Sequence, residues 1–179
     1  MPNSYVVTSI SCGRDHTLAL LTSGKVFGWG RDGSGRIAPD TPEYCSTSKA
    51  PTRAVEVNAR KRLVSVAAGY GVSLAITAGD QVAVWGANSA GVGGRPGSIA
   101  LSTPQYLTDV AEARTVVAGE FLFGAIDAAG TIHTWGLNDE GALGRPTSQL
   151  NALPGPVTTS PPASQLALGN PAARIRDPP

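Results

Sequence analysis

The sequence predicts an all-β protein: a partial β-propeller of about three blades, each a small antiparallel sheet. One sequence pattern recurs along the chain, and glycine and proline, at 22 and 14 of the 179 residues, interrupt it often. The segments between are short apolar or β-branched runs, which are typical of strands. Repeats of about 50 residues that each hold a small sheet are typical of propeller blades.

Three segments, residues 10–38, 66–94 and 116–144, align without a gap. Equivalent positions lie 56 and then 50 residues apart, as in the steps from 13 to 69 and from 69 to 119. All three tryptophans of the chain fall at one repeat position. The constant positions, which we interpret as structural, are Gly13, Trp29, Gly30, Gly69, Trp85, Gly86, Gly119, Trp135 and Gly136.

Each repeat is expected to contain three strands and to gain a fourth from the segment that follows it. In the second repeat the strands are predicted at residues 63–68, 72–76 and 81–85, with the turn "TAGD" before the last. "TSGK" and "DAAG" are the equivalent turns of the other repeats. The segments "KAPTRAVEV", "STPQYLTDV" and "LPGPVTTS" are the candidates for the fourth strands, with proline at an edge.

A fourth repeat begins near residue 164, where "SQLALG" ends at Gly169. We therefore expect one repeat domain over residues 1–170. Residues 171–179 form a proline-rich tail that would discourage further strand pairing and serve as a cap.

The stretch "GWGRDGSG" spells G-x-G-x-x-G through Gly28, Gly30 and Gly33, as in a dinucleotide-binding turn. That turn requires a helix directly after it, whereas Pro39 and Pro42 follow here. Position 28 is also valine or threonine in the other repeats. The glycines are interpreted as structural, and no cofactor is expected.

Composition excludes several classes of function. A net charge of +1 gives no strong signal for nucleic acid or an anionic membrane. Cys12 and Cys45 are too few for a disulfide framework, and no signal peptide or membrane span is predicted. The chain is expected to be soluble and cytoplasmic, and its arginine-over-lysine bias suggests a bacterial source.

In these repeat positions the chain resembles the regulator of chromosome condensation repeat family. "ISCGRDHTLAL" with "VFGWG", and "TWGLNDEGALG", match its pattern, and the resemblance covers residues 8–169. The match is imperfect: His16 becomes Val72 and Leu122 in later repeats, and the terminal Leu-Gly becomes Ile37-Ala38 or Gly93-Gly94. Kelch and WD propellers are alternatives, but the WD dipeptide is missing. The glycine doublet expected inside each kelch blade is also missing, since Gly93-Gly94 lies after the tryptophan.

The resemblance implies a ring of seven blades, which three repeats cannot close because open sheet edges remain. The chain then self-associates as a homodimer that closes the ring, belongs to a longer protein, or exists as a capped partial array.

No catalytic or metal site is predicted. Cys12 and His16 have a spacing compatible with a metal pair, yet the later repeats place alanine at the first position. We therefore interpret Cys12 as a small buried residue, and the resemblance implies a hydrogen bond within the blade for His16. His133 is expected to be partly exposed or hydrogen-bonded. The carboxylates of residues 138–140 and the basic residues 60–62 are interpreted as surface, and the tryptophans as packing between blades.

The tips that follow the first glycine of each repeat vary while the framework stays constant. They read Arg14-Asp15, Tyr70-Gly71 and Glu120-Phe121, and they are expected to lie on one propeller face. Tyrosine, phenylalanine and arginine are common interface anchors. The predicted binding residues are Arg14, Asp15, Tyr70, Glu120 and Phe121.

The sequence thus predicts a non-enzymatic scaffold that binds a protein partner of unknown identity. Two alternatives remain open at this stage. The resemblance also implies guanine-nucleotide exchange on a small GTPase, and the chain could be an inactive fragment of a larger propeller.

Overall fold

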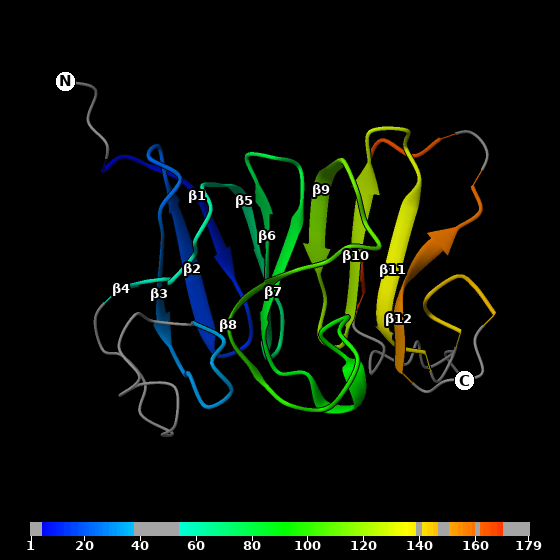
Figure 1. The fold of residues 1–179 in the computed structure, drawn as a ribbon, viewed down its shortest axis with the longest axis horizontal. Helices are drawn as coiled ribbons and strands as arrows, with labels where there is room; N and C mark the ends of the chain where they lie inside the picture. Colours follow the sequence, from blue (N-terminus) through cyan, green and yellow to red (C-terminus); the bar gives the residue numbers. More distant parts are fainter. Residues whose placement is uncertain (1–4, 38–53, 139–140, 147–150, 160–161, 170–179) are drawn as a thin grey trace, which may run out of the picture.

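The computed structural model describes residues 5–37, 54–138, 141–146, 151–159 and 162–169, which form three antiparallel four-stranded sheets side by side (Figure 1). Blade 1 contains β1 (Val7–Cys12), β2 (His16–Leu21), β3 (Val26–Gly30) and β4 (Val55–Glu56). Blade 2 contains β5 (Leu63–Ala68), β6 (Val72–Thr77), β7 (Val82–Gly86) and β8 (Leu101–Tyr106), with a 3-10 turn, η1 (Ser89–Gly91), after β7. Blade 3 contains β9 (Ala113–Ala118), β10 (Leu122–Asp127), β11 (Ile132–Leu137) and β12 (Asn151–Val157).

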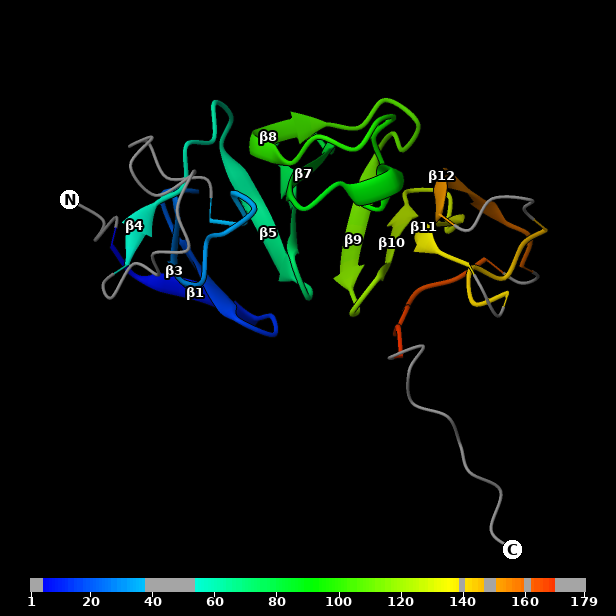
Figure 2. The same ribbon diagram turned by 90° about the horizontal axis from the view of Figure 1, so that it is seen from below.

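The predicted partial β-propeller is confirmed. Each proline-bearing segment supplies the fourth strand of its blade. The first strands β1, β5 and β9 contact one another in series and line the inner side of an arc (Figure 2). The predicted turns between second and third strands place Gly24, Asp80 and Gly130 at positive φ, as tight hairpins require.

The hydrophobic core lies between blades, and both boundaries use the same repeat positions. Blade 1 presents Leu18 and Leu20 to Trp85 of blade 2. Blade 2 presents Leu74 and Ile76 to blade 3, where Trp135 takes the equivalent place. We call the side of a blade that faces the next blade along the chain its front face, and the opposite side its back face. Large aliphatic side chains on the front face of one blade thus meet small residues and a tryptophan on the back face of the next. Trp85 and Trp135 are fully buried, which agrees with the predicted packing between blades.

The glycine after each tryptophan permits a backbone contact that a side chain would prevent. Gly30, Gly86 and Gly136 have φ of 105°, 106° and 105°. A Cβ on these residues would lie 2.4, 2.3 and 2.2 Å from the carbonyl oxygens of residues 15, 71 and 121. The repeat therefore needs glycine for both its backbone conformation and the available space.

A side-chain amide or carboxylate closes the loop after each of these glycines. Asp32 Oδ1 accepts the Ile37 N–H at 2.8 Å. The equivalent residues Asn88 and Asn138 accept the amides of the residues five positions on, at 3.1 and 3.0 Å. The same bond in all three blades identifies this position as structural.

The back face of blade 1 lacks a preceding blade in the structure. Ile10 is 60% exposed, whereas its equivalents Val66 and Val116 are 8% and 7% exposed. Trp29 is half-buried for the same reason. Cys12 is exposed, so its interpretation as a buried residue is wrong: the alanine at this position in blade 2 is buried only because blade 1 covers it.

His16 forms a hydrogen bond across a blade boundary, which corrects the expectation of a bond within one blade. Its Nε2 lies 2.8 Å from Ser73 Oγ on β6. The Ser73 hydroxyl donates to the Arg36 carbonyl at 2.6 Å, so His16 must be the donor and carry its proton on Nε2. Burial, followed by the charge of Arg36, lowers the pKa of His16 from 6.5 to about 4.

The opening of the fourth repeat covers the front face of blade 3. The Ala163 N–H donates to the Gly130 carbonyl at 2.9 Å, as Ala113 does to Asp80 in the preceding blade at 2.8 Å. Leu168 packs against the buried Leu122 and Leu143. Residues 162–169 thus take the place of an inner strand without forming a regular one. Cys45, Pro39, Pro42, the end of the first repeat and the predicted cap at 171–179 lie outside the described residues.

Gly86→Ala should destabilise the fold by about 3 kcal/mol or more, because it combines unfavourable φ with a backbone clash. Gly97→Ala is the matched control: its φ is 96° but nothing lies within 4 Å of the added Cβ. Urea denaturation of both variants measures the difference. Equal losses would show that the close backbone contact contributes nothing.

Acidification should destabilise the chain through His16. Since its folded pKa of about 4 lies below the ordinary 6.5, the unfolded chain binds the proton first as the pH falls. The free energy of unfolding that depends on neutral His16 is fully present above pH 6.5. It decreases toward pH 4, by about 2 kcal/mol between pH 7 and pH 5. Urea denaturation across this range should show a shallower slope for His16→Gln. An unchanged slope would assign the effect to other groups.

Candidate functional site

The three tips predicted to bind lie at one end of the array, between the first and second strands of each blade, at the lower edge of Figure 1. We call this end the loop face. The carbonyls of residues 15, 71 and 121 accept the N–H groups of Arg31, Ala87 and Leu137 at 2.7, 2.8 and 2.8 Å. Each of these donors directly follows the glycine after the tryptophan. The framework therefore fixes the backbone of every tip.

The tips of neighbouring blades are also in contact. The Arg14 N–H donates to the Gly69 carbonyl at 3.2 Å. A Cβ on Gly13 would lie 2.2 Å from that oxygen, and one on Gly69 would lie 2.6 Å from the Gly119 oxygen. The first glycine of each repeat thus permits one tip to pack on the next.

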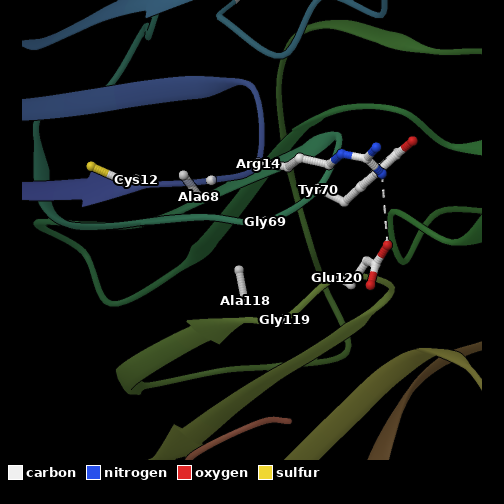
Figure 3. Close-up of a pocket in the computed structure, with 9 residues that line it drawn as sticks. Cys12, Arg14, Ala68, Gly69, Tyr70, Ala118, Gly119 and Glu120 are labelled. Atoms are coloured by element: carbon white, nitrogen blue, oxygen red, sulfur yellow. Dashed lines mark ion pairs between the residues drawn. The ribbon is translucent and has the colours of Figure 1, made fainter. Parts of the chain in front are cut away.

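All five predicted binding residues meet in one cluster. The Arg14 guanidinium lies over the Tyr70 ring, 4.4 Å from its centroid, and 3.9 Å from the Glu120 carboxylate (Figure 3). The Tyr70 and Phe121 rings are 5.0 Å apart between centroids. Both aromatic residues are half-buried, so part of each remains available to a partner. Asp15 joins through Arg14, so the three blades contribute one cation, two rings and two carboxylates to a continuous surface.

Asp15 links this cluster to two further arginines. Its carboxylate lies 3.6 Å from Arg36 Nη1, 3.8 Å from Arg31 Nη1 and 3.9 Å from Arg14 Nε. The Arg14 and Arg31 side chains are 58% and 61% exposed, whereas those of Asp15 and Glu120 are 29% and 23% exposed. The cations are therefore outermost on the loop face.

Arg36 is a residue of the candidate site that the sequence interpretation missed. It is buried, its Nη1 donates to the Tyr70 carbonyl at 3.2 Å, and its backbone carbonyl accepts from Ser73. Burial lowers the pKa of Arg36 from its ordinary value, while Asp15 opposes that shift. The signal was available in the repeat alignment, because Arg36 occupies a position that holds Val92 and Ala142 in the other repeats.

Two pockets open at the loop face. The axial pocket, about 460 Å³, is lined by the tips of all three blades and by Cys12, Ala68 and Ala118 (Figure 3). The interblade pocket, about 380 Å³, lies between blades 2 and 3 and shares Tyr70 and Glu120 with the first. Because both pockets are built on fixed tips, the loop face offers preformed concave surfaces.

His133, Lys61 and Arg62 make contacts within the fold. Within the described ranges no three His, Cys, Asp or Glu residues gather in a way that could hold a metal. His133 pairs with Asp127 at 3.0 Å, with its side chain 13% exposed. In the basic cluster, Lys61 lies 4.3 Å from the Tyr106 ring centroid and Arg62 donates to the Thr22 carbonyl. Among the described residues no helix has the length and hydrophobicity needed to span a bilayer.

Comparison with known proteins agrees with this architecture. The family model "Regulator of chromosome condensation (RCC1) repeat" matches residues 129–171, and a second model of the same description matches residues 7–36. The RCC1 domain-containing protein RUG3, mitochondrial, of Arabidopsis thaliana is 39% identical over 80 residues, which are 45% of this chain and 17% of that protein. The human probable E3 ubiquitin-protein ligase HERC6 is 34% identical over 88 residues, which are 49% of this chain and 8% of that protein.

Among solved structures, Prp20p of Saccharomyces cerevisiae superimposes with a TM-score of 0.75 at 22% identity, over 86% of this chain and 39% of Prp20p. The chain thus spans less than one fifth of the curated relatives and about two fifths of this structure. The repeat positions, the blade topology and both family matches agree in identifying regulator of chromosome condensation (RCC1) repeats in this chain.

Proposed function

We propose that this chain is a non-enzymatic protein-interaction module that binds its partner through the loop face. The observation that carries the proposal is the cluster of Arg14, Tyr70 and Phe121, one tip residue from each blade in mutual contact. Arginine and tyrosine are enriched among residues that dominate interface energies, and aromatic side chains bury a large area at low entropic cost.

The surroundings of the cluster support binding rather than catalysis. The described residues of the loop face offer arginines, carboxylates and aromatic rings, and no nucleophile paired with a general base lines either pocket. The tips are held by backbone hydrogen bonds, so a partner would meet a surface that needs little ordering. Prp20p, which shares the fold, is described by its binding properties to Gsp1p and histones.

Binding should depend on the two rings of the loop face. Tyr70→Ala/Phe121→Ala removes both, and we expect the partner's affinity to fall at least tenfold, equivalent to about 1.4 kcal/mol. The measurement is quantitative affinity enrichment from a lysate of the source organism, followed by titration of the enriched protein.

Val64→Ala is the matched control for this experiment. Val64 is an exposed apolar residue at the start of β5, whereas the tip of that blade follows the end of β5. Equal enrichment by wild type and both variants would contradict binding through the loop face. Acceleration of nucleotide release from a small GTPase would instead support the exchange-factor alternative. Loss of cooperative unfolding in the isolated chain would support the inactive-fragment alternative.

We further propose that a second copy covers the back face of blade 1. This face exposes Ile10 and part of Trp29, and Tyr5, Val6 and Val7 beside it are also exposed. The front face of blade 3 is already occupied by residues 162–169, so a back-to-back dimer requires less rearrangement than a head-to-tail ring. The residues equivalent to Ile10 in blades 2 and 3, Val66 and Val116, are buried because a neighbouring blade covers them.

Light scattering after size exclusion, over a dilution series, measures the dimer. Wild type should have about twice the chain mass of 18.2 kDa, and Ile10→Asp should shift it toward the monomer. Ile99→Asp is the control, since Ile99 is exposed on another part of the surface. A concentration-independent mass of one chain would refute the dimer and leave the loop-face proposal intact.

A further inference from the structure

The two blade boundaries share a backbone but differ in the side chains that fill them near the loop face. Between blades 1 and 2, His16 bonds Ser73, and Arg36 lies near Asp15. In the next repeat these four positions become Val72, Phe123, Val92 and Gly71, so every polar group is lost. A polar network at one boundary has become an apolar site at the other.

The missing side chain at position 71 leaves room for the interblade pocket. Phe123 and Val72 are 0% and 2% exposed and form part of its apolar lining. Tyr70 and Phe121 also line it, from two different tips. A Cβ on Gly71 would meet the Ala87 Cβ at 3.4 Å and Arg36 Nη2 at 3.7 Å, which are ordinary contacts. A Cβ at position 71 would therefore fit without a clash, and the lack of a side chain there keeps the pocket open.

Charged groups stand at the edge of this apolar lining. The side chain of Arg36 is 8% exposed and lines the pocket, and its Nε has no hydrogen-bond partner among the described residues. Its nearest carboxylate, Asp15, is 3.6 Å away and also lies near Arg14 and Arg31. The buried Asp32 accepts the Ile37 amide. Glu120 also lines the pocket, but its carboxylate lies 3.9 Å from Arg14, so Arg36 is the guanidinium of the lining that can hold a further negatively charged group.

We infer that the interblade pocket receives an apolar side chain of a partner polypeptide, with an adjacent acidic residue held by Arg36. This inference rests on the proposed function and identifies the chemistry of the partner. The apolar side chain is buried against Phe123, Val72 and Phe121. The neighbouring carboxylate accepts a hydrogen bond from the Arg36 guanidinium, which Asp15 only partly engages. Burial of an aliphatic side chain supplies affinity, and the charge pair selects the sequence.

Titration of the isotope-labelled full chain with acetylated peptides of Gly and Ser that carry Asp-Leu-Asp at their centre tests this inference by NMR. We expect shifts of the Gly71 and Val92 amides. Leu→Ser in the peptide should weaken binding at least tenfold, because a buried leucine contributes about that factor. Lys-Leu-Lys should bind more weakly than Asp-Leu-Asp.

Gly71→Leu should fill the pocket and abolish the shifts. Gly79→Leu is the matched control, because Gly79 lies in a hairpin turn of the same blade, without a positive φ and with only Thr77 Oγ1 within 4 Å. Peptides that bind both variants equally, or no peptide binding at all, would overturn the inference. If neither peptide binds while Tyr70→Ala/Phe121→Ala still loses the natural partner, the pocket inference fails and the proposed function stands.

Discussion

The structure depends on close backbone contact at positions that have no side chain. The glycine after each tryptophan allows the preceding tip carbonyl to approach within 2.4 Å of where a Cβ would lie. The next residue donates its N–H to that same carbonyl. A single glycine therefore sets the backbone of the tip, the end of the third strand and the position of the buried tryptophan. Because the first glycine of each repeat packs on the next tip in the same way, this local constraint extends from blade to blade.

The core follows from that arrangement. In the part of the chain that the structure describes, each of the two large core clusters joins side chains of two neighbouring blades, as expected of repeat proteins. β6 is buried along its whole length because blade 2 has a neighbour on both sides. β1 likewise combines apolar and small polar residues, yet much of it is exposed because no other described blade covers the back face of blade 1. Burial here is a property of position in the array as much as of residue type.

This explains which features the sequence could predict. Repeat spacing located the strands, the hairpin turns and the tips, since these are local and recur in every copy. It also predicted that the five candidate binding residues share one face, because equivalent positions of the repeats must share a face. It failed where a residue's environment depends on the neighbouring blade: Cys12 aligns with the buried Ala68 but is exposed, and His16 bonds across a boundary. Arg36 was overlooked because it lies in a loop, although the apolar residues at its position in the other repeats, Val92 and Ala142, marked the position as different from an ordinary surface arginine.

The difference between the two boundaries shows that one repeat backbone accommodates different sets of side chains. The strands accommodate either polar or apolar side chains at a blade boundary, because both sets pack against the same backbone. The His16–Ser73–Arg36 network pairs most of its buried polar atoms and so specifies one arrangement of blades 1 and 2. The apolar residues at the second boundary need no hydrogen bonds, which leaves that boundary free to expose a pocket beside Tyr70 and Phe121. One boundary therefore defines how the blades dock, and the other can be shaped by a partner.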